Sequence, residues 1–430
     1  MASSNIEVVI IGGGAAGIAA GQRLCAAETR CLVVEARPRL GGRAWTVVDR
    51  SGFPIDLGCG WLHSANRNPW SKIAQAQGRS IDKTPPPWMR PSLEIGFPRS
   101  EQNDFGKALG TFFACLDRRE ENEPDAPAEV LLEPDGRWNN LINAVSTYIS
   151  GVELDRLSVE DFNRYDDSGV NWRVVEGYGA TITAHGTDVP VMLDCAVRRI
   201  DHRGKRLRIE TAKGTIEADQ AIVTVPSALL AEEKLLFTPA LPEKIQAALG
   251  LPLGLADKLF LSLEDAEEFE KDSRLFGHID RAGTGAYHFR PFGRPQIEVY
   301  FGGRLASELE AASERDFFDF ATSELATLLG SAFSRRISPI HIHRWGVDPF
   351  SHGSYSFALP GCADCRQTLA EPVDDRLFFA GEACSRRDFS TAHGAFITGI
   401  AAADRVIALR TQDERGVGTA TVADNKGAGS

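Results

Sequence analysis

A glycine-rich turn near the start of the chain could hold a phosphate-containing ligand. Residues 12–17 read Gly-Gly-Gly-Ala-Ala-Gly and give the pattern G-x-G-x-x-G through Gly12, Gly14 and Gly17. Glycines let the backbone turn tightly and approach a pyrophosphate, which then lies at the positive end of the following helix. Glu35 lies 18 positions beyond the last of these glycines. Its carboxylate can accept hydrogen bonds from both hydroxyls of an adenosine ribose and repels a 2′-phosphate, so the pattern disfavours NADP.

A second turn rich in glycine and arginine follows directly. Residues 35–43 read Glu-Ala-Arg-Pro-Arg-Leu-Gly-Gly-Arg. Gly41 and Gly42 allow close backbone approach to a ligand, and Arg43 can neutralise a phosphate through charge-assisted hydrogen bonds. An arginine just past the ribose site favours FAD over NAD. The alternative is a solvated basic turn.

Composition and charge exclude several other classes of protein. The 430 residues carry 47 Lys and Arg against 59 Asp and Glu, a net charge of −12, which argues against general nucleic-acid binding. There is no run of about 20 apolar residues and no signal-peptide pattern, so we expect no membrane span.

Eight cysteines without an export signal predict reduced thiols in a cytoplasmic protein. Cys362 and Cys365 lack a second pair at zinc spacing, and His341 and His343 lack a third ligand, so no metal site is predicted.

The elements that position the two turns form a βαβ unit. A β-branched run at Glu7–Ile11, a helix from Ile18 to about Ala27 and a second buried strand at Arg30–Glu35 surround the glycine turn. Further helices are predicted over Asp104–Arg119, Trp138–Ser150, Glu314–Leu329 and His393–Leu409. Further strands are predicted over Val191–Leu193, Ala196–Asp201, Arg206–Thr211, Thr215–Ala218, Ala221–Thr224, Lys258–Leu263, Ala286–Phe289, Gln296–Phe301, Ile337–Trp345 and Leu377–Ala380.

Several segments together resemble the flavin-containing amine oxidase family. The turn at 35–43 resembles the sequence that follows this family's βαβ unit, and Asp-Leu-Gly-Cys-Gly-Trp-Leu-His at 56–63 resembles its stretch beside the flavin. The resemblance covers residues 6–408, is weak over 84–170, and is closest to the polyamine oxidase branch through Trp-Leu-His-Ser at 61–64 and Ser-Thr-Ala-His-Gly-Ala at 390–395. Other matching segments are Gly177–Gly179, Thr224–Pro226, Asp257–Phe260, Trp345–Ser356 and Phe379–Ala383.

The resemblance implies an α/β fold with two interleaved parts. A Rossmann-like FAD-binding domain is expected over residues 1–83, 173–240 and 346–410, and an α+β substrate-binding domain with a mixed sheet over 84–172 and 241–345. Residues 411–430 are polar and glycine-rich and are expected to be disordered. A histone demethylase of this family is disfavoured, because no extra helical hairpin is evident. The expected state is a monomer or homodimer.

The resemblance also implies the residues that hold FAD. Ser354 stands where monoamine oxidases have the cysteine that bonds covalently to the flavin, so FAD is expected to be non-covalent. The helix that begins near Thr391 is expected to direct its positive N-terminus at the flavin. The expected cofactor-binding residues are Gly12, Gly14, Ala16, Gly17, Glu35, Ala36, Arg37, Gly41, Gly42, Arg43, Gly58, Gly60, Trp61, Val197, Gly381, Glu382, Thr391 and Ala392.

The same resemblance implies a catalytic lysine and a substrate pocket. Lys258 is expected near flavin N5, bridged by water, with a pKa lowered by burial; the alternative is a lysine that faces solvent. Trp345 and Tyr355 are expected to form an apolar wall, or else to be core aromatics. His63 is expected to contact the substrate, or else to be structural. Thr391 replaces the second pocket tyrosine of monoamine oxidases, which suits a longer, thinner substrate. The expected pocket comprises His63, Trp61, Trp345, Tyr355 and Thr391.

The implied activity is FAD-dependent oxidation of a small-molecule amine. Hydride passes from the carbon next to nitrogen to the flavin, the imine is hydrolysed to an aldehyde, and O2 yields hydrogen peroxide; a polyamine or another secondary amine is favoured. Alternatives are a monoamine, alkaloid-amine or L-amino-acid oxidase, for which Arg290 or Arg344 could hold a carboxylate, a desaturase of a non-amine, and a non-catalytic flavin-binding partner protein. Five acids remain open as partners of a second ammonium: Glu153, Asp155, Asp166, Asp167 and Asp280.

Overall fold

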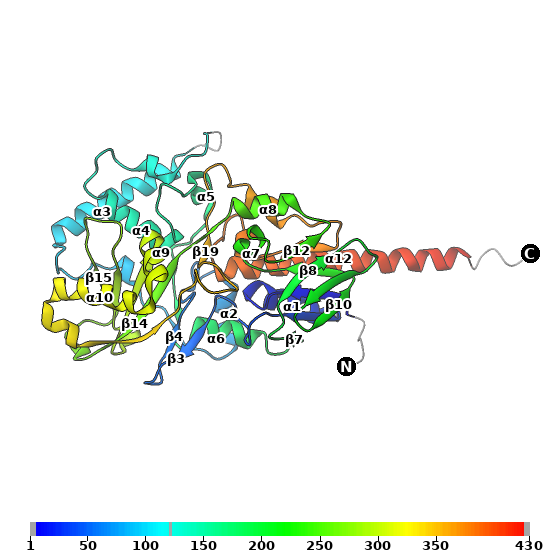
Figure 1. Ribbon diagram of the computed structural model, residues 1–430, viewed down its shortest axis with the longest axis horizontal. Helices are drawn as coiled ribbons and strands as arrows, with labels where there is room; N and C mark the ends of the chain where they lie inside the picture. Colours follow the sequence, from blue (N-terminus) through cyan, green and yellow to red (C-terminus); the bar gives the residue numbers. More distant parts are fainter. Residues whose placement is uncertain (1–5, 120–122, 425–430) are drawn as a thin grey trace, which may run out of the picture.

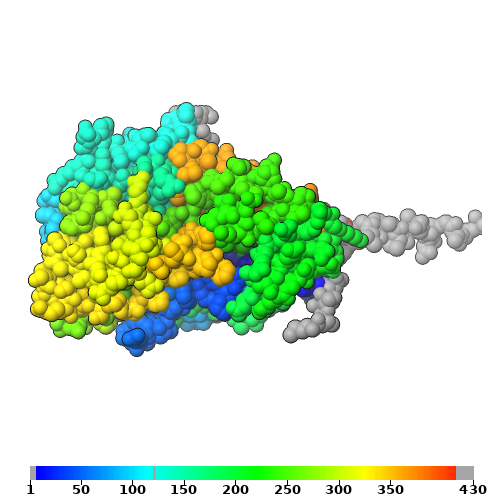
Figure 2. Space-filling model, in the orientation of Figure 1, coloured from blue at the N-terminus to red at the C-terminus, as the bar shows by residue number. Residues whose placement is uncertain are grey.

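The computed structural model describes residues 6–119 and 123–424, with side chains described as far as residue 412. Two bodies lie side by side along the long axis of the molecule (Figure 1). In the space-filling view, orange segments late in the sequence lie between the yellow and green bodies (Figure 2). The chain passes between the bodies several times, so each one is assembled from separate stretches of sequence.

A parallel sheet forms the centre of the first body. Its strands run in the order β20-β11-β1-β2-β7, and β1 pairs in parallel with both β2 and β11. Residues 8–11 are buried on both faces of the sheet, which explains the continuous Val-Val-Ile-Ile run. The strand bounds are β1 Val8–Ile11, β2 Cys31–Val34, β7 Val191–Met192, β11 Gln220–Val223 and β20 Leu377–Phe379.

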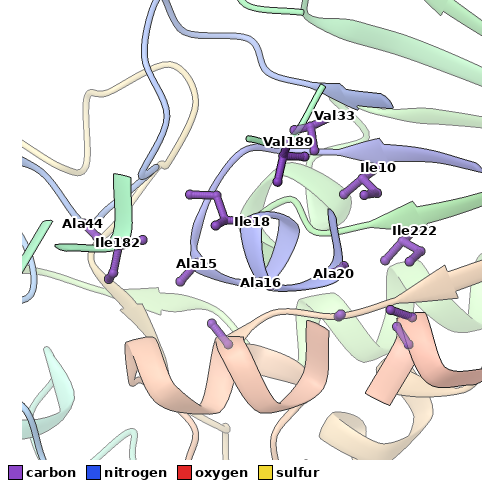
Figure 3. Close-up of a cluster of buried hydrophobic side chains, with 14 of the residues drawn as sticks. Ile10, Ala15, Ala16, Ile18, Ala20, Val33, Ala44, Ile182, Val189 and Ile222 are labelled. Carbon is purple, nitrogen blue, oxygen red and sulfur yellow. The ribbon is translucent and has the colours of Figure 1, made fainter. Parts of the chain in front are cut away.

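Two long helices pack against this sheet. Helix α1 (Ala15–Ala26) begins directly after the glycine turn, and α12 (Ala392–Asp424) lies along it. The two backbones approach closely, because a Cβ on Gly399 would lie 2.3 Å from the carbonyl oxygen of Ala16. Side chains such as Ile10, Ile18 and Ile222 fill the space between strands and helices (Figure 3). This packing fixes the direction of the N-terminus of α1.

A four-stranded sheet and several short helices complete the first body. The sheet runs β10-β9-β8-β12, with β8 antiparallel to β9 and parallel to β12. Its strands are β8 Val197–Asp201, β9 Leu207–Thr211, β10 Gly214–Ala218 and β12 Leu236–Thr238. The helices are α2 Pro69–Ala76, α6 Tyr178–His185, α7 Ser227–Ala231, α8 Pro242–Leu249 and α11 Cys365–Ala370.

An antiparallel sheet forms the second body, in the order β15-β16-β17-β14-β18. One face of this sheet is core, where Leu259, Tyr287 and Val299 pack under α9 and α10. The strands are β14 Ala256–Leu263, β15 Ser273–Phe276, β16 Ala286–Phe289, β17 Gln296–Gly302 and β18 Ile337–Ile342. The helices are α3 Arg99–Asp117, α4 Asn139–Ser150, α5 Val159–Arg164, α9 Gly303–Ala312 and α10 Glu314–Leu329.

Three small pairs of strands join the bodies. They are antiparallel: β3 (Thr46–Val48) with β4 (Pro54–Asp56), β5 (Ile81–Asp82) with β6 (Arg173–Val174), and β13 (Leu253–Gly254) with β19 (Tyr355–Ser356). Two of these pairs join residues that are far apart in sequence. The predicted residue bounds of the two domains stay a prediction.

The structure corrects the bounds of several predicted elements. The helix predicted over Asp104–Arg119 begins earlier, at Arg99, and the strand predicted to reach Trp345 ends at Ile342. Residues 411–424, within the tail expected to be disordered, continue α12, and the expected disorder stays a prediction. Thr411 makes the regular helical contact, with its hydroxyl donating to the carbonyl of Ile407 at 2.9 Å. Residues 425–430 lie outside the described residues.

Candidate active site

A cavity of about 690 Å³ runs from the glycine turn to the sheet of the second body. Its lining includes every residue predicted to bind cofactor or substrate, with the exception of Gly17. Residues from four distant parts of the sequence therefore meet at one site. The predicted residues on its wall are Gly12, Gly14, Ala16, Glu35, Ala36, Arg37, Gly41, Gly42, Arg43, Gly58, Gly60, Trp61, His63, Val197, Lys258, Trp345, Tyr355, Gly381, Glu382, Thr391 and Ala392.

The glycine turn leaves space for a ligand at the N-terminus of α1. A Cβ on Gly14 would meet no protein atom within 4 Å. Gly12 has a φ of +107° and is pressed against Thr224, whose hydroxyl oxygen would lie 2.6 Å from a Cβ there. Gly17 corrects the prediction: its Cβ would lie 1.9 Å from the carbonyl oxygen of Gly12, so this glycine allows α1 to pack on the turn. These are the roles that a pyrophosphate-binding turn requires.

Glu35 lies at the end of β2, where the prediction places the ribose. Its side chain is only 4% exposed and accepts hydrogen bonds from the backbone N–H of Gly13 at 2.6 Å and of Arg37 at 2.8 Å. These bonds fix the carboxylate at the wall of the cavity. Arg37 is held in turn by Asp348, with 2.5 Å between Nη2 and Oδ1.

Arg43 and Glu382 form an ion pair at the cavity wall. Arg43 Nη1 donates to Glu382 Oε1 at 2.9 Å and to the carbonyl of Ser354 at 2.8 Å. Burial alone would raise the pKa of Glu382, but Arg43 and the hydroxyl of Ser356 lower it overall. Glu382 also accepts from the backbone N–H of Ser390 at 3.0 Å. The pair shows that Glu382 orients Arg43 as well as bordering the cavity.

The N-terminus of α12 reaches the same cavity. Thr391, Ala392 and Ala395 line it. The hydroxyl of Thr391 accepts from the backbone N–H of Gly394 at 2.9 Å and donates to the carbonyl of Asp388 at 2.6 Å, so it caps the helix. An uncharged cap leaves the positive helix end available to an anionic group.

Lys258 is buried and paired with a carboxylate that the sequence analysis did not single out. Its Nζ lies 3.0 Å from Glu298 Oε1 on the neighbouring strand β17 and donates to the carbonyl of Asp56 at 3.1 Å. Burial by itself lowers the pKa of Lys258, but Glu298, with Tyr300 and Asp56, raises it well above its ordinary value. The prediction of a lowered pKa is therefore wrong, because burial was considered without the carboxylate. Lys258 keeps its positive charge at neutral pH.

The strand register explains how Lys258 and Glu298 meet on the cavity face of the second sheet. One cross-strand row joins Lys258, Tyr300, Ala286 and Phe276 on β14, β17, β16 and β15. The adjacent row joins Phe260, Glu298, His288 and Arg274 on the same four strands. Because side chains alternate between faces, both rows lie on the face opposite the core.

Buried polar contacts continue from this sheet face to Trp61. His288 Nε2 lies 3.1 Å from Asp272 Oδ1, and Arg173 Nη2 lies 2.9 Å from the same oxygen. The guanidinium of Arg173 stacks over Trp61, with 4.9 Å between its central carbon and the ring centroid. Trp61 meets Trp88 edge to face at 4.4 Å, and Trp88 is 44% exposed. Trp88 therefore lies at the mouth of the cavity.

His63 is held as a neutral hydrogen-bond acceptor. Its Nδ1 lies 2.7 Å from Asn171 Oδ1, and the amide nitrogen of Asn171 donates to the carbonyl of Gly169. Because the amide oxygen can only accept, Nδ1 carries the proton and Nε2 has a free lone pair. Burial lowers the pKa of His63, although Asn171 partly opposes this effect. Nε2 can therefore accept a hydrogen bond from an amine N–H.

One of the five candidate acids lines the cavity. Asp167 lies on the wall near His63, and its Oδ1 accepts from the hydroxyl of Ser64 at 3.1 Å. The other four lie elsewhere: Glu153 and Asp155 bind Arg304, Asp166 pairs with Arg67, and the carbonyl of Asp280 accepts from Asn140.

Aromatic side chains form much of the remaining wall. Trp345 is 1% exposed and donates from Nε1 to the carbonyl of Leu57 at 3.2 Å, while Tyr355 donates to the carbonyl of Tyr148 at 2.8 Å. Further lining residues were not predicted, although the alternating Gln296, Glu298 and Tyr300 were a usable signal in the predicted strand over 296–301. The missed residues are Trp88, Tyr148, Phe162, Tyr165, Asn171, Arg274, Phe276, Tyr287, His288, Tyr300 and Phe389.

The arginines considered for an amino-acid oxidase do not border the cavity. Arg290 donates to the carbonyl of Phe269 at 2.9 Å, and Arg344 donates to the carbonyl of Glu310 at 3.1 Å. All eight cysteines are free thiols, and Cys362 and Cys365 pack against Gly250. Within the described ranges, no group of three or more His, Cys, Asp or Glu could hold a metal ion.

Helix α12 also contains an apolar stretch. Among the residues described, Ala392–Gln412 is the single helical segment long and apolar enough to cross a membrane, with a mean hydropathy of 1.2. Length and composition do not separate such a segment from a core helix, and 33% of it is buried, with its N-terminal end at the cavity and its side against α1.

Comparison with known proteins agrees with the site. The family described as flavin containing amine oxidoreductase matches residues 15–143 and 102–407. The chain belongs to this family. It is 30% identical to polyamine oxidase 4 of Oryza sativa subsp. japonica, over 93% of this chain and 88% of that protein. It is 29% identical to lysine-specific histone demethylase 1 homolog 3 of Oryza sativa subsp. indica, over 97% of this chain but 56% of that protein.

A solved structure has the same fold. A redesigned putrescine oxidase superposes with a TM-score of 0.75 over 94% of this chain and 99% of its own, at 16% identity. The family makes this chain an FAD-dependent amine oxidoreductase. The residues fit that cofactor: an open glycine turn at the N-terminus of α1, a buried acid at the end of β2, and the capped end of α12 all border one continuous cavity.

Proposed function

We propose that this chain oxidises a secondary amine at the carbon next to its nitrogen. The observation that carries the proposal is the place of Lys258 and His63, which face the same cavity as the FAD-binding turn. Bound FAD supplies the hydride acceptor and passes its electrons to O2, which becomes hydrogen peroxide. Water then adds to the imine, and the adduct breaks into an aldehyde and a shorter amine.

The chain's own residues bind and orient the amine. Tyr355 and Trp345 supply aromatic surface, which attracts the carbons next to a charged nitrogen and excludes water. The free lone pair on His63 Nε2 can accept the N–H of the neutral amine. Lys258, kept charged by Glu298, can hold an ordered water with its third N–H, since two of its donors face Glu298 and Asp56.

A polyamine is the secondary amine that the names of the relatives suggest, since several are called polyamine oxidases. Asp167 is the carboxylate on the cavity wall that could take a second ammonium. We also propose that FAD is non-covalent, because Ser354 replaces a cysteine and its hydroxyl bonds to the backbone of Ala256 at 2.9 and 3.1 Å.

Product analysis tests the proposal. The purified holoenzyme is incubated in air with spermidine, an N-methylalkylamine, benzylamine and an α-amino acid, and peroxide, aldehyde and released amine are measured together. We expect the three products in equal amounts from a secondary amine. Peroxide without aldehyde and shorter amine would contradict the proposal. Release of the yellow cofactor on denaturation tests its non-covalent attachment.

A further inference from the structure

Arg274 is a cationic side chain on the cavity wall with no anionic partner. It lies on β15 and lines the cavity, and its Nε is buried without a hydrogen-bond partner. Within the described part of the chain, no carboxylate lies within ion-pair distance of its guanidinium. Two other arginines of the lining differ, since Arg37 is paired with Asp348 and Arg43 with Glu382. The remaining one, Arg198, has an exposed side chain. Because buried polar groups normally have a hydrogen-bond partner, a buried donor without one beside a cavity points to a ligand that accepts its hydrogen bond.

The surroundings of Arg274 hold it in place. Its backbone carbonyl accepts from Leu93 N–H at 2.8 Å and from the hydroxyl of Ser92 at 3.0 Å. The guanidinium stacks over Phe276, with 4.9 Å between its central carbon and the ring centroid. Burial lowers the pKa of Arg274 to about 10, so it stays charged at neutral pH. The site is therefore a fixed positive charge beside an aromatic wall.

The sheet sets the distance between Arg274 and the proposed oxidation site. Arg274 lies on β15 and Lys258 on β14, with β16 and β17 between them. Neighbouring strands lie about 4.8 Å apart, so these two strands are separated by roughly 14 Å. The carboxylate of an α-amino acid lies one carbon from the oxidised C–N bond and cannot span this distance. A carboxylate at the far end of an extended amine can.

We propose that Arg274 is an anion subsite that takes the remote carboxylate of an amine substrate. The inference rests on the proposed function and specifies its substrate class: an amine and a carboxylate joined by an extended apolar spacer. A guanidinium binds a carboxylate through two parallel N–H donors, and it repels an ammonium at the same place. Among secondary amines, the site therefore favours a remote carboxylate over the second ammonium of a polyamine.

Three amines of equal length test the subsite: an ω-(methylamino)alkanoate, the corresponding N-methylalkylamine and the corresponding N-methyl-α,ω-diamine. Each is tested over a series of spacer lengths with the holoenzyme and with Arg274→Gln, Arg274→Lys and the control Arg90→Gln. Arg90 carries the same charge near the cavity mouth, where it donates to the carbonyl of Lys271 at 3.4 Å, but it does not line the cavity.

We expect the ω-(methylamino)alkanoate to have a kcat/KM at least about tenfold above that of the other two amines. Most of this difference should be a lower KM. Arg274→Gln should abolish this preference, Arg274→Lys should retain part of it, and Arg90→Gln should leave it unchanged. Equal kcat/KM values, a preference for the diamine, or a preference that survives Arg274→Gln would overturn the inference.

A binding measurement separates this inference from the proposed oxidation. A plain alkanoate and its amide cannot be oxidised as amines, and each is titrated into the holoenzyme by calorimetry. We expect the alkanoate to bind at least about tenfold more tightly than the amide, with the difference lost in Arg274→Gln. If no amine is oxidised but this difference holds, the proposed function fails and the subsite stands. If amines are oxidised but the two ligands bind equally, the subsite fails alone.

Discussion

Lys258 is the residue whose charge matters most to the proposed chemistry. Its ammonium is buried against Glu298 and stays protonated, so it offers a fixed positive charge and a donor for water. We predict that Lys258→Met slows reoxidation of the reduced enzyme by O2 by about tenfold to a hundredfold, because a fixed positive charge and the N–H that can hold an ordered water are lost. Stopped-flow mixing with oxygenated buffer measures this rate. Reoxidation at the unaltered rate would remove Lys258 from this step.

The ion pair of Lys258 with Glu298 predicts that a change at either residue destabilises the fold. Both side chains are about 10% exposed, so removing one leaves the other as a buried charge without its partner in this ion pair. We predict that Lys258→Met and Glu298→Gln each lower the free energy of unfolding by about 3–5 kcal/mol, and that the double variant loses less than the sum. Chemical denaturation of the apo forms measures the three values. Additive losses would mean that the pair is not coupled.

The burial of His63 predicts that the free energy of unfolding depends on pH. Its pKa in the folded protein is lowered by burial, whereas an unfolded histidine titrates near pH 6.5. The unfolded chain therefore binds a proton that the folded chain does not, and the free energy of unfolding falls as the pH drops below about 6.5. His63→Gln should show a smaller fall. NMR titration of labelled histidine tests the cause, and a His63 signal that titrates at or above pH 6.5 would contradict it.

At the scale of elements, two glycines of the turn before α1 have different roles. Gly14 borders the space for the cofactor, whereas Gly17 allows α1 to pack on the turn. A Cβ on Gly14 would enter open space beside the cavity, whereas a Cβ on Gly17 would lie 1.9 Å from the Gly12 carbonyl. We predict that Gly14→Ala lowers FAD affinity at least about tenfold with little change in apo stability, because FAD approaches the backbone there. Gly17→Ala should lower both the affinity for FAD and the stability of the apo protein.

Fluorescence titration of the apo variants with FAD, together with their unfolding curves, measures both effects. Normal FAD affinity in Gly14→Ala would mean that the open space is not used by the cofactor. Apo stability unchanged in Gly17→Ala would mean that α1 can shift away from the turn.

Local patterns predicted the elements that depend on nearby residues. The βαβ unit is evident within residues 7–35, because glycines, buried strands and Glu35 follow one another closely. The pairing of Lys258 with Glu298 was not predictable, because it depends on the register of β14 against β17. Arg274 was missed because β15 is a short edge strand that gains its place from pairing with β16. The short helices α2 and α6 were also missed, as they depend on contacts with each other and with α12 or α1.

At the scale of the whole molecule, the fold brings two sources of chemistry to one cavity. The parallel sheet with α1 and α12 supplies the FAD-binding wall, and the antiparallel sheet supplies Lys258, Glu298 and Arg274. Residues of both bodies line the cavity, so neither body alone encloses it. Oxidation of an amine is therefore a property of the joined bodies, and the central claim is that electrons pass from amine to FAD across this cavity.

Anaerobic mixing tests this claim most directly. The yellow holoenzyme is mixed, without O2, with secondary amines of several lengths, including spermidine and the ω-(methylamino)alkanoates, and with benzylamine and α-amino acids as comparisons. We predict that at least one secondary amine bleaches the flavin absorbance within a turnover, while the α-amino acids do not. A flavin that stays oxidised with every amine, although dithionite reduces it, would contradict the account.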